Sequence, residues 1–357
     1  MKLFAAACFV LLLNIAGRVA EARAVAGDVA TSGAITVVIT ITSRGPSGRT
    51  SCSCSGTTSP TTATAPRIRG WALSPARGAT PSASRNEAAH GRKPTGRFSD
   101  GLVQSDFLAK IMGHSESPPP YTGDSDNWDD GIDASGMNFA VAEAGALEAP
   151  SGVLKLRAQV QQLRDLVRDG LVDDRDFTDS VALVAYSESE RSGGEGGGRA
   201  GVVSQLQDLG VSKVIVNNVP PFGCSPWLAK ASNYSSCDDD GNVSSDEHNT
   251  ALRDRLGGEE GVMVLDVNSI ITNLVAPKEG SVLYERQFAE RLRPCSEAAG
   301  EEGGYCGRDG GYSLCNRPEE YFFWDVVHPT HAGWRAVMQL LQGPIMAFLG
   351  ISDLEHF

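Results

Sequence analysis

The residues of this sequence best suited to acid–base chemistry are Asp325 and His328, which stand three positions apart directly before Pro329. At this spacing the carboxylate can accept a hydrogen bond from one imidazole nitrogen, and the other nitrogen can then act as a general base. Proline suits the first turn of a helix, so we expect the pair in a loop that leads into one. The alternative interpretation is a carboxylate and an imidazole that only cap this helix.

Strands and helices that could position this pair alternate from Met137 to the C-terminus. Short valine-rich apolar runs predict buried strands at residues 180–185, 213–219 and 262–267. Helices are expected over residues 152–169, 202–209, 245–256 and 330–349. This alternation is typical of an α/β fold with a parallel sheet covered on both faces, in which chemistry sits at the carboxyl ends of the strands.

The composition is that of an acidic globular protein. The 357 residues include 31 Lys and Arg against 44 Asp and Glu, which gives a net charge of −13, and 41% of the residues are hydrophobic. Such a chain lacks the basic footprint of a nucleic-acid-binding protein, so that class of partner is excluded. Its ordinary hydrophobic content also excludes disorder throughout and fibrous architectures.

The first residues have the layout of a secretory signal peptide. Lys2 precedes an apolar run from Leu3 to Ile15, and small residues in an Ala-x-Ala pattern follow up to Ala24. The apolar run is too short to span a bilayer, and no later segment is long and apolar enough to do so. We therefore expect residues 1–24 to be removed and the mature protein to be soluble, in the extracellular space or the cell wall.

The cysteines agree with an oxidising compartment. Beyond Cys8, the last five of the remaining cysteines lie in loop-like surroundings rich in Gly and Asp, which favours disulfides. Their spacing does not suit zinc, and we expect neither a metal nor a cofactor. Cys224 and Cys237 would close a short loop and are the favoured pair, while one of the five must lack a partner. Sequons for N-glycosylation begin at Asn233 and Asn242 in the same polar segment.

Residues 25–90 differ from the rest of the chain. Residues 29–86 contain no Asp or Glu and are dominated by Arg, Thr, Ser, Pro and Ala. The plain interpretation is a linker or a mucin-like stalk of low complexity. We expect this segment to be irregular.

Several sequence blocks resemble those of plant-type GDSL esterase/lipases, which belong to the SGNH hydrolase superfamily. The blocks are GRFSDG at residues 96–101 with PPPY at 118–121, MNFA at 137–140, VPPFGC at 219–224 and FWDVVHPT at 323–330. They follow the family's order over about residues 91–350, which makes the set specific although no single block is.

The resemblance implies a three-layer α/β/α sandwich over residues 91–350 and the hydrolysis of small-molecule carboxylic esters, either lipid esters or acylated carbohydrates. In the family, the residues that match Asp325 and His328 activate a serine for acyl transfer, without a cofactor. That serine belongs to an N-terminal Phe-Gly-Asp-Ser block, which this sequence does not contain.

A shifted reading frame would account for the missing serine block. In this frame, each new codon consists of the third base of one codon and the first two bases of the next. With suitable synonymous codons for residues 50–66, the shifted frame can encode Phe-Val-Phe-Gly-Asp-Asp-Phe-Ala-Asp-Asn-Gly-Asn, which is close to the family's opening block. The hypothesis is that residues from about 30 to 88 are translated out of frame, with the linker as the alternative. Even the shifted codon cannot encode serine at the nucleophile position, so the nucleophile stays unassigned.

The oxyanion-hole positions also depart from the family. Ala142 stands where the family has glycine, and Ser189 replaces an asparagine that would donate to the oxyanion. Ser99, Ser180 and Ser187 offer hydroxyl groups, but none lies in a Gly-Asp-Ser setting, and we expect structural roles for them. The sequence therefore leaves two functions open, an ester hydrolase and an inactive secreted relative that binds a glycan or an acyl ligand.

Overall fold

The structure of the chain is a computed structural model. It describes residues 38–43, 97–118, 120–121, 136–140, 156–172, 177, 180–185, 197–281, 288–298 and 312–352. The expected signal peptide lies outside these residues, as does most of the segment 25–90.

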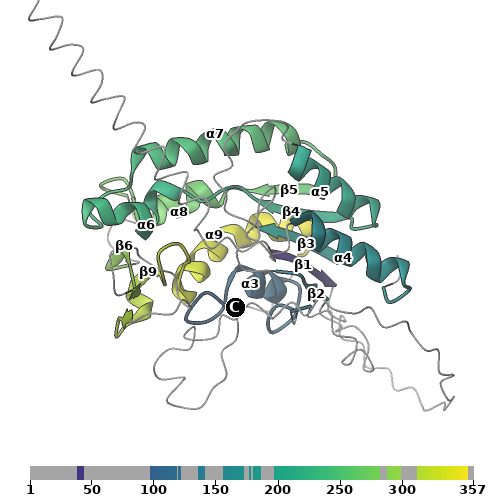
Figure 1. The fold of residues 1–357 in the computed structure, drawn as a ribbon, viewed down its shortest axis with the longest axis horizontal. Helices are drawn as coiled ribbons and strands as arrows, with labels where there is room; N and C mark the ends of the chain where they lie inside the picture. Colours follow the sequence, from purple (N-terminus) through teal and green to yellow (C-terminus); the bar gives the residue numbers. More distant parts are fainter. Residues whose placement is uncertain are drawn as a thin grey trace, which may run out of the picture.

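A five-stranded sheet with the strand order β2-β1-β3-β4-β5 forms the centre of the fold (Figure 1). Its members are β1 (Val38–Ser43), β2 (Met137–Asn138), β3 (Ser180–Ala185), β4 (Lys213–Asn217) and β5 (Val262–Leu265). The neighbours β3, β4 and β5 are parallel, with Leu183 opposite Ile215 and Ile215 opposite Met263. The three strands predicted from valine-rich runs, and their parallel arrangement, are confirmed.

Strand β1 corrects two expectations. It lies in the segment 25–90 that was expected to be irregular, and it runs antiparallel to both β2 and β3, so the sheet is mixed rather than wholly parallel. Residues 38–43 read VITITS, and β-branched residues favour extended structure. An open edge of β3 offers unpaired backbone groups to such a segment. The expectation of irregular structure is therefore wrong for these six residues.

Helices follow the strands in the predicted alternation. They are α3 (Gln104–Ile111), α4 (Leu156–Arg168), α5 (Gly197–Asp208), α6 (Pro226–Ala229), α7 (Asp239–Leu256), α8 (Val267–Val275) and α9 (His331–Leu349), with short 3-10 turns η3 (Phe222–Cys224), η4 (Lys230–Ser232) and η5 (Pro318–Glu320). Helix α8 was not predicted, because the strand was expected to continue to residue 267. The Asp266 carboxylate accepts the backbone N–H of Ser269 and begins α8 there instead.

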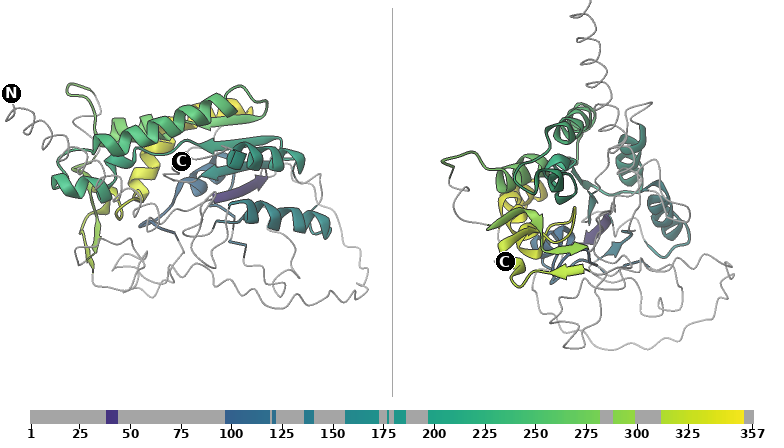
Figure 2. Two further views of the ribbon diagram at one scale, coloured as in Figure 1. Left: turned by 45° about the horizontal axis from the view of Figure 1, so that its top comes forward. Right: turned by 60° about the vertical axis from the view of Figure 1, so that its left-hand side comes forward.

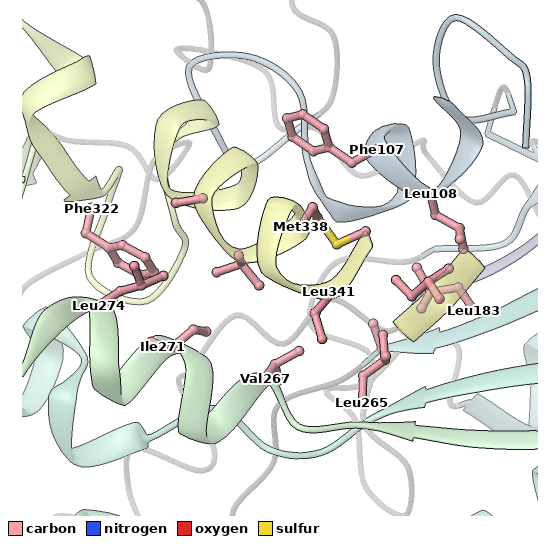
Figure 3. Packing of buried hydrophobic residues seen from close by; sticks show 14 of the residues in the cluster. Phe107, Leu108, Leu183, Leu265, Val267, Ile271, Leu274, Phe322, Met338 and Leu341 are labelled. Atoms are coloured by element: carbon pink, nitrogen blue, oxygen red, sulfur yellow. The ribbon is translucent and has the colours of Figure 1, made fainter. Parts of the chain in front are cut away.

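Alternate residues of β3 and β4 face two separate hydrophobic clusters. Leu183 and Ile215 belong to a cluster with apolar side chains of α3, α8 and α9, part of which Figure 3 shows. Val184 and Val216 belong to a second cluster, with side chains of α4, α5 and α7. This period of two is that of a strand buried on both faces. The result is the expected three-layer α/β/α arrangement, seen from two further sides in Figure 2.

Two small strand pairs lie outside the central sheet. Strand β6 (Glu290–Pro294) pairs with β9 (Tyr321–Phe323), and β7 (Ser296–Ala298) pairs with β8 (Tyr312–Leu314). The loop that contains Asp325 and His328 connects β9 to α9, so both ends of this loop are fixed by regular structure. No helix in the described ranges is both long and apolar enough to cross a membrane.

Candidate active site

Asp325 and His328 are in direct contact. Nδ1 of His328 lies 2.9 Å from each carboxylate oxygen of Asp325. The Asp325 side chain is fully buried, whereas 15% of the His328 side chain is exposed. An ionised carboxylate only accepts hydrogen bonds, so this geometry assigns the proton to Nδ1 and makes Nε2 the nitrogen that can accept a proton.

The Asp325 carboxylate also closes the loop on which both residues lie. Its Oδ1 accepts the backbone N–H groups of Val327 at 3.0 Å and His328 at 2.8 Å. The backbone N–H of Trp324 donates to the carbonyl of His328 at 2.7 Å. A short loop of this kind holds the carboxylate and the imidazole at a fixed separation, because the carboxylate itself is part of the turn.

Neighbouring segments anchor this loop from two sides. Ser296 N–H donates to the Trp324 carbonyl at 2.6 Å, next to the pairing of β6 with β9. Trp227 N–H donates to the Val326 carbonyl at 3.0 Å, from the segment that follows β4. The loop therefore touches the connection that leaves the carboxyl end of a central strand, which is where α/β proteins place their sites.

Helix α9 has its own cap. The Thr330 hydroxyl accepts the Gly333 N–H at 2.9 Å and donates to the Tyr321 carbonyl at 2.8 Å. The interpretation of Asp325 and His328 as the cap of this helix is therefore wrong, because Thr330 caps it. The contact between the carboxylate and the imidazole is separate from the start of the helix.

The Arg97–Leu102 segment packs against the same loop. The ring of Phe98 stacks on the His328 imidazole, with the centroids 4.7 Å apart and the ring planes at 10°. The buried Ser99 hydroxyl donates to the Pro329 carbonyl at 3.1 Å. The sequence predicted a structural role for Ser99 but gave none to Phe98, since only the fold shows that positions 98 and 328 meet.

A buried ion pair fixes the start of this segment. Arg97 donates to both oxygens of the Asp106 carboxylate, at 2.7 and 2.8 Å, and Asp106 also accepts from Val103 N–H and from Ser117. Burial alone would raise the pKa of Asp106, but the hydrogen bonds and the Arg97 charge outweigh it and hold that pKa below its ordinary value. The sequence contained no spacing that could have revealed this pair.

Two of the three serines singled out from the sequence lie in the described ranges, and each has a structural partner. Ser99 donates to Pro329 as above, and the Ser180 hydroxyl donates to the Phe177 carbonyl at 2.8 Å. Ser187 lies outside the described residues, and so do the oxyanion-hole positions Ala142 and Ser189. The family's nucleophile position is likewise outside them.

Two disulfides join cysteines of the described residues. Cys224 bonds to Cys237, the pair favoured by their spacing, and Cys295 bonds to Cys315, which the sequence did not single out. Cys306 lies outside the described residues. The second disulfide packs against Trp324, the residue before Asp325, and was missed because cysteine positions alone do not define connectivity.

The two sequons differ in their surroundings. Asn233 is exposed, at a left-handed position with φ of 54°. Asn242 lies in α7, with Nδ2 3.6 Å from the Cys224 sulfur and a buried Oδ1. In the described parts of the chain, no cluster of three or more His, Cys, Asp or Glu side chains could hold a metal ion.

The comparisons with known proteins agree with this architecture. A GDSL esterase/lipase of Arabidopsis thaliana is 32% identical to the chain over 289 residues, which are 72% of this chain and 85% of that protein. A second one from the same plant is 30% identical over 290 residues, or 72% of this chain and 78% of that protein. The chain belongs to the GDSL esterase/lipase family.

A more distant member of the family is the GDSL lipase of Tanacetum cinerariifolium, which is 28% identical over 276 residues, or 69% of this chain and 72% of that protein. A comparison with models of known protein families finds no match. The family's activity is ester hydrolysis, and the resemblance drawn from the sequence blocks is confirmed at this level.

Proposed function

We propose that this chain is built as a secreted ester hydrolase, with His328 as the general base and Asp325 as the residue that orients it, but without the family's nucleophile. The observation that supports this most directly is the contact of Nδ1 with both oxygens of a fully buried carboxylate. The substrates we propose are lipid esters or acylated carbohydrates, in line with the esterases and lipases among its relatives.

The geometry suits proton transfer at Nε2. With Nδ1–H donating to Asp325, Nε2 takes the proton of an attacking hydroxyl group and later returns it to the departing alcohol. The imidazolium that forms in between is stabilised by the adjacent carboxylate. These steps require no cofactor.

The nucleophile is the missing part. The printed sequence has no Phe-Gly-Asp-Ser block near its N-terminus, and the proposed frame slip over residues from about 30 to 88 accounts for its loss. The triplet Gly123-Asp124-Ser125 follows a threonine rather than a phenylalanine and lies outside the described residues. General-base catalysis without the serine leaves at most a weakly activated water. The transcript sequence across codons 28–92 tests the frame slip, since an unbroken frame that encodes the printed residues would contradict it.

Hydrolysis of a short p-nitrophenyl ester tests the catalytic assignment. We expect the chain as printed and its His328→Ala variant both to stay near the background rate, because neither has the family's nucleophile. Loss of one oxyanion donor would lower any residual rate by roughly 10²–10³. A robust activity that His328→Ala abolishes would confirm the base and show that a serine of the printed sequence serves as nucleophile.

The missing serine block favours a second function, in which the chain binds an acyl or glycan ligand without cleaving it. In this case a long-chain ester should raise the melting temperature of the protein and be recovered intact. Recovery of the free acid in excess of a no-protein control would exclude this second function.

A further inference from the structure

The GRFSDG block at residues 96–101 has no part in the chemistry described so far, although it lies against the proposed base. Phe98 of this block stacks on His328 with nearly parallel rings. We propose that Phe98 is a positioning residue, which holds the imidazole of His328 in the orientation that keeps Nδ1 on Asp325. The inference deepens the proposed function and rests on it, since an orientation matters only if His328 is the base.

One hydrogen bond at Nδ1 does not define the orientation of an imidazole ring. The second side-chain torsion of histidine has broad minima, so a ring without a further contact can turn about its attachment and carry Nδ1 away from the carboxylate. Here Nδ1 is at equal distances from the two oxygens of Asp325, 2.9 Å each, which leaves two acceptors to choose between. The Phe98 ring has its centroid 4.7 Å from that of the imidazole, and the two ring planes are at 10°. It opposes a rotation of the imidazole, because a tilted imidazole would overlap sterically with the Phe98 ring.

Phe98 can restrain His328 only if its own backbone is held. The residue before it, Arg97, is bound to the buried Asp106 at the start of α3. The residue after it, Ser99, donates to the carbonyl of Pro329, which is the residue after His328. The two backbones are therefore joined directly beside the stacked rings.

A second set of contacts continues this attachment. The Asp100 carboxylate accepts the backbone N–H of His331 at 2.7 Å, and His331 Nδ1 accepts the backbone N–H of Leu102 at 2.9 Å. Gly101 lies so close to His331 that a Cβ atom would be 2.8 Å from Nδ1. Residues 98–102 are thus docked on residues 328–331, with Phe98 as the member that contacts the base.

Nuclear magnetic resonance of the histidine rings tests the inference without any need for turnover. In the unaltered chain, we expect the His328 ring to show a single Nδ1–H tautomer and ring-proton signals displaced by the ring current of Phe98. Phe98→Leu should abolish that displacement and replace the single-tautomer pattern by an average of the two tautomers. Phe98→Tyr keeps the aromatic ring and should restore both signatures. A His328→Gln variant assigns the signals.

Phe107→Leu is the matched control. It removes a ring that lies 5.6 Å from the imidazole of His331, and it should therefore alter the His331 signals and leave those of His328 in place. Phe98→Met repeats the test with a flexible side chain should Phe98→Leu fail to fold.

Retention of the single tautomer of His328 in either aliphatic variant would overturn the inference, because Asp325 alone would then suffice. So would an equal effect of Phe107→Leu on His328. Failure of the proposed function has a different signature, namely an oriented His328 in a protein that never hydrolyses an ester even when a nucleophile is present.

Discussion

At the scale of the residue, two histidines three positions apart, one in the loop before α9 and one at its first position, are held in opposite tautomers. His328 uses Nδ1 as a donor to the carboxylate of Asp325, whereas His331 uses Nδ1 as an acceptor for the backbone N–H of Leu102. The first arrangement keeps Nε2 as an acceptor of protons, and the second requires the proton of a neutral ring to be on Nε2. Local partners, rather than residue type, therefore decide which histidine is suited to act as a base.

His331 should make the stability of the fold dependent on pH. Burial lowers the pKa of His331 below its ordinary value of 6.5, against the opposing charge of Asp100, and protonation of Nδ1 would remove the acceptor of Leu102 N–H. As the pH falls, His331 of the unfolded chain binds a proton at a higher pH than His331 of the folded chain. The contribution of this residue to the free energy of unfolding is therefore fully retained above about pH 6.5 and is lost as the pH drops toward the lowered pKa of the folded state.

Urea unfolding across this pH window measures the effect. His331→Asn places an oxygen near the position of Nδ1 and does not titrate, so this variant should lack that part of the pH dependence. All other titratable groups are the same in the two proteins, so their contributions cancel in the comparison. Parallel pH profiles of the two proteins would contradict the role of His331.

At the scale of the element, helix α3 is anchored by charge rather than by an ordinary cap. Val103 precedes the helix and has no side chain that could cap it, and the buried Asp106 carboxylate accepts the Val103 N–H instead. The same carboxylate binds Arg97, so the helix start and the segment that carries Phe98 share one anchor. The position of α3 is further tied to the sheet by paired amide hydrogen bonds between Gln104 and Asn217 at the end of β4.

Asp106→Asn should destabilise the fold by about 3 kcal/mol, because it leaves the Arg97 guanidinium without its main partner in a largely buried setting. The free energy of unfolding in urea at neutral pH is the measurement. Asp165→Asn is the control, since it breaks a pair between the exposed side chains of Asp165 and Arg168, and it should leave the free energy of unfolding nearly unchanged. Equal losses in the two variants would contradict the anchoring role of Asp106.

At the scale of the whole molecule, the three parallel strands of the sheet and several helices followed from the sequence, whereas the contacts between distant loops did not. Strands β3, β4 and β5 were predictable because short valine-rich runs between helical segments favour buried strands. The spacing of Asp325 and His328 also predicted their contact, because three residues in a turn leave little freedom. The Phe98 stack could not be predicted, since it joins positions 230 residues apart that only the folded chain brings together.

The N-terminal third was the hardest part to predict. Strand β1 pairs along the edge of β3, but its antiparallel direction differs from that of every other neighbour of β3 and β4 in the sheet. Under the proposed frame slip, the segment would lose the motif of the missing block but could still contain β-branched runs that pair with an open strand. Composition alone therefore predicted an anomaly in this segment but not that six of its residues form a strand.

The mature protein in a plant secretory system should begin near Val25 and carry one N-glycan, at Asn233. This sequon is exposed, whereas a glycan on Nδ2 of Asn242 would displace that side chain from the Cys224–Cys237 disulfide at the start of α7. N-terminal sequencing and the mass lost on enzymatic deglycosylation are the measurements. Asn233→Gln should abolish the mass loss and Asn242→Gln should leave it unchanged. A mature, unglycosylated protein that retains Met1 would contradict secretion. A glycan on Asn242 would show that this side chain can leave the disulfide, and that exposure in the folded state does not decide which sequon is glycosylated.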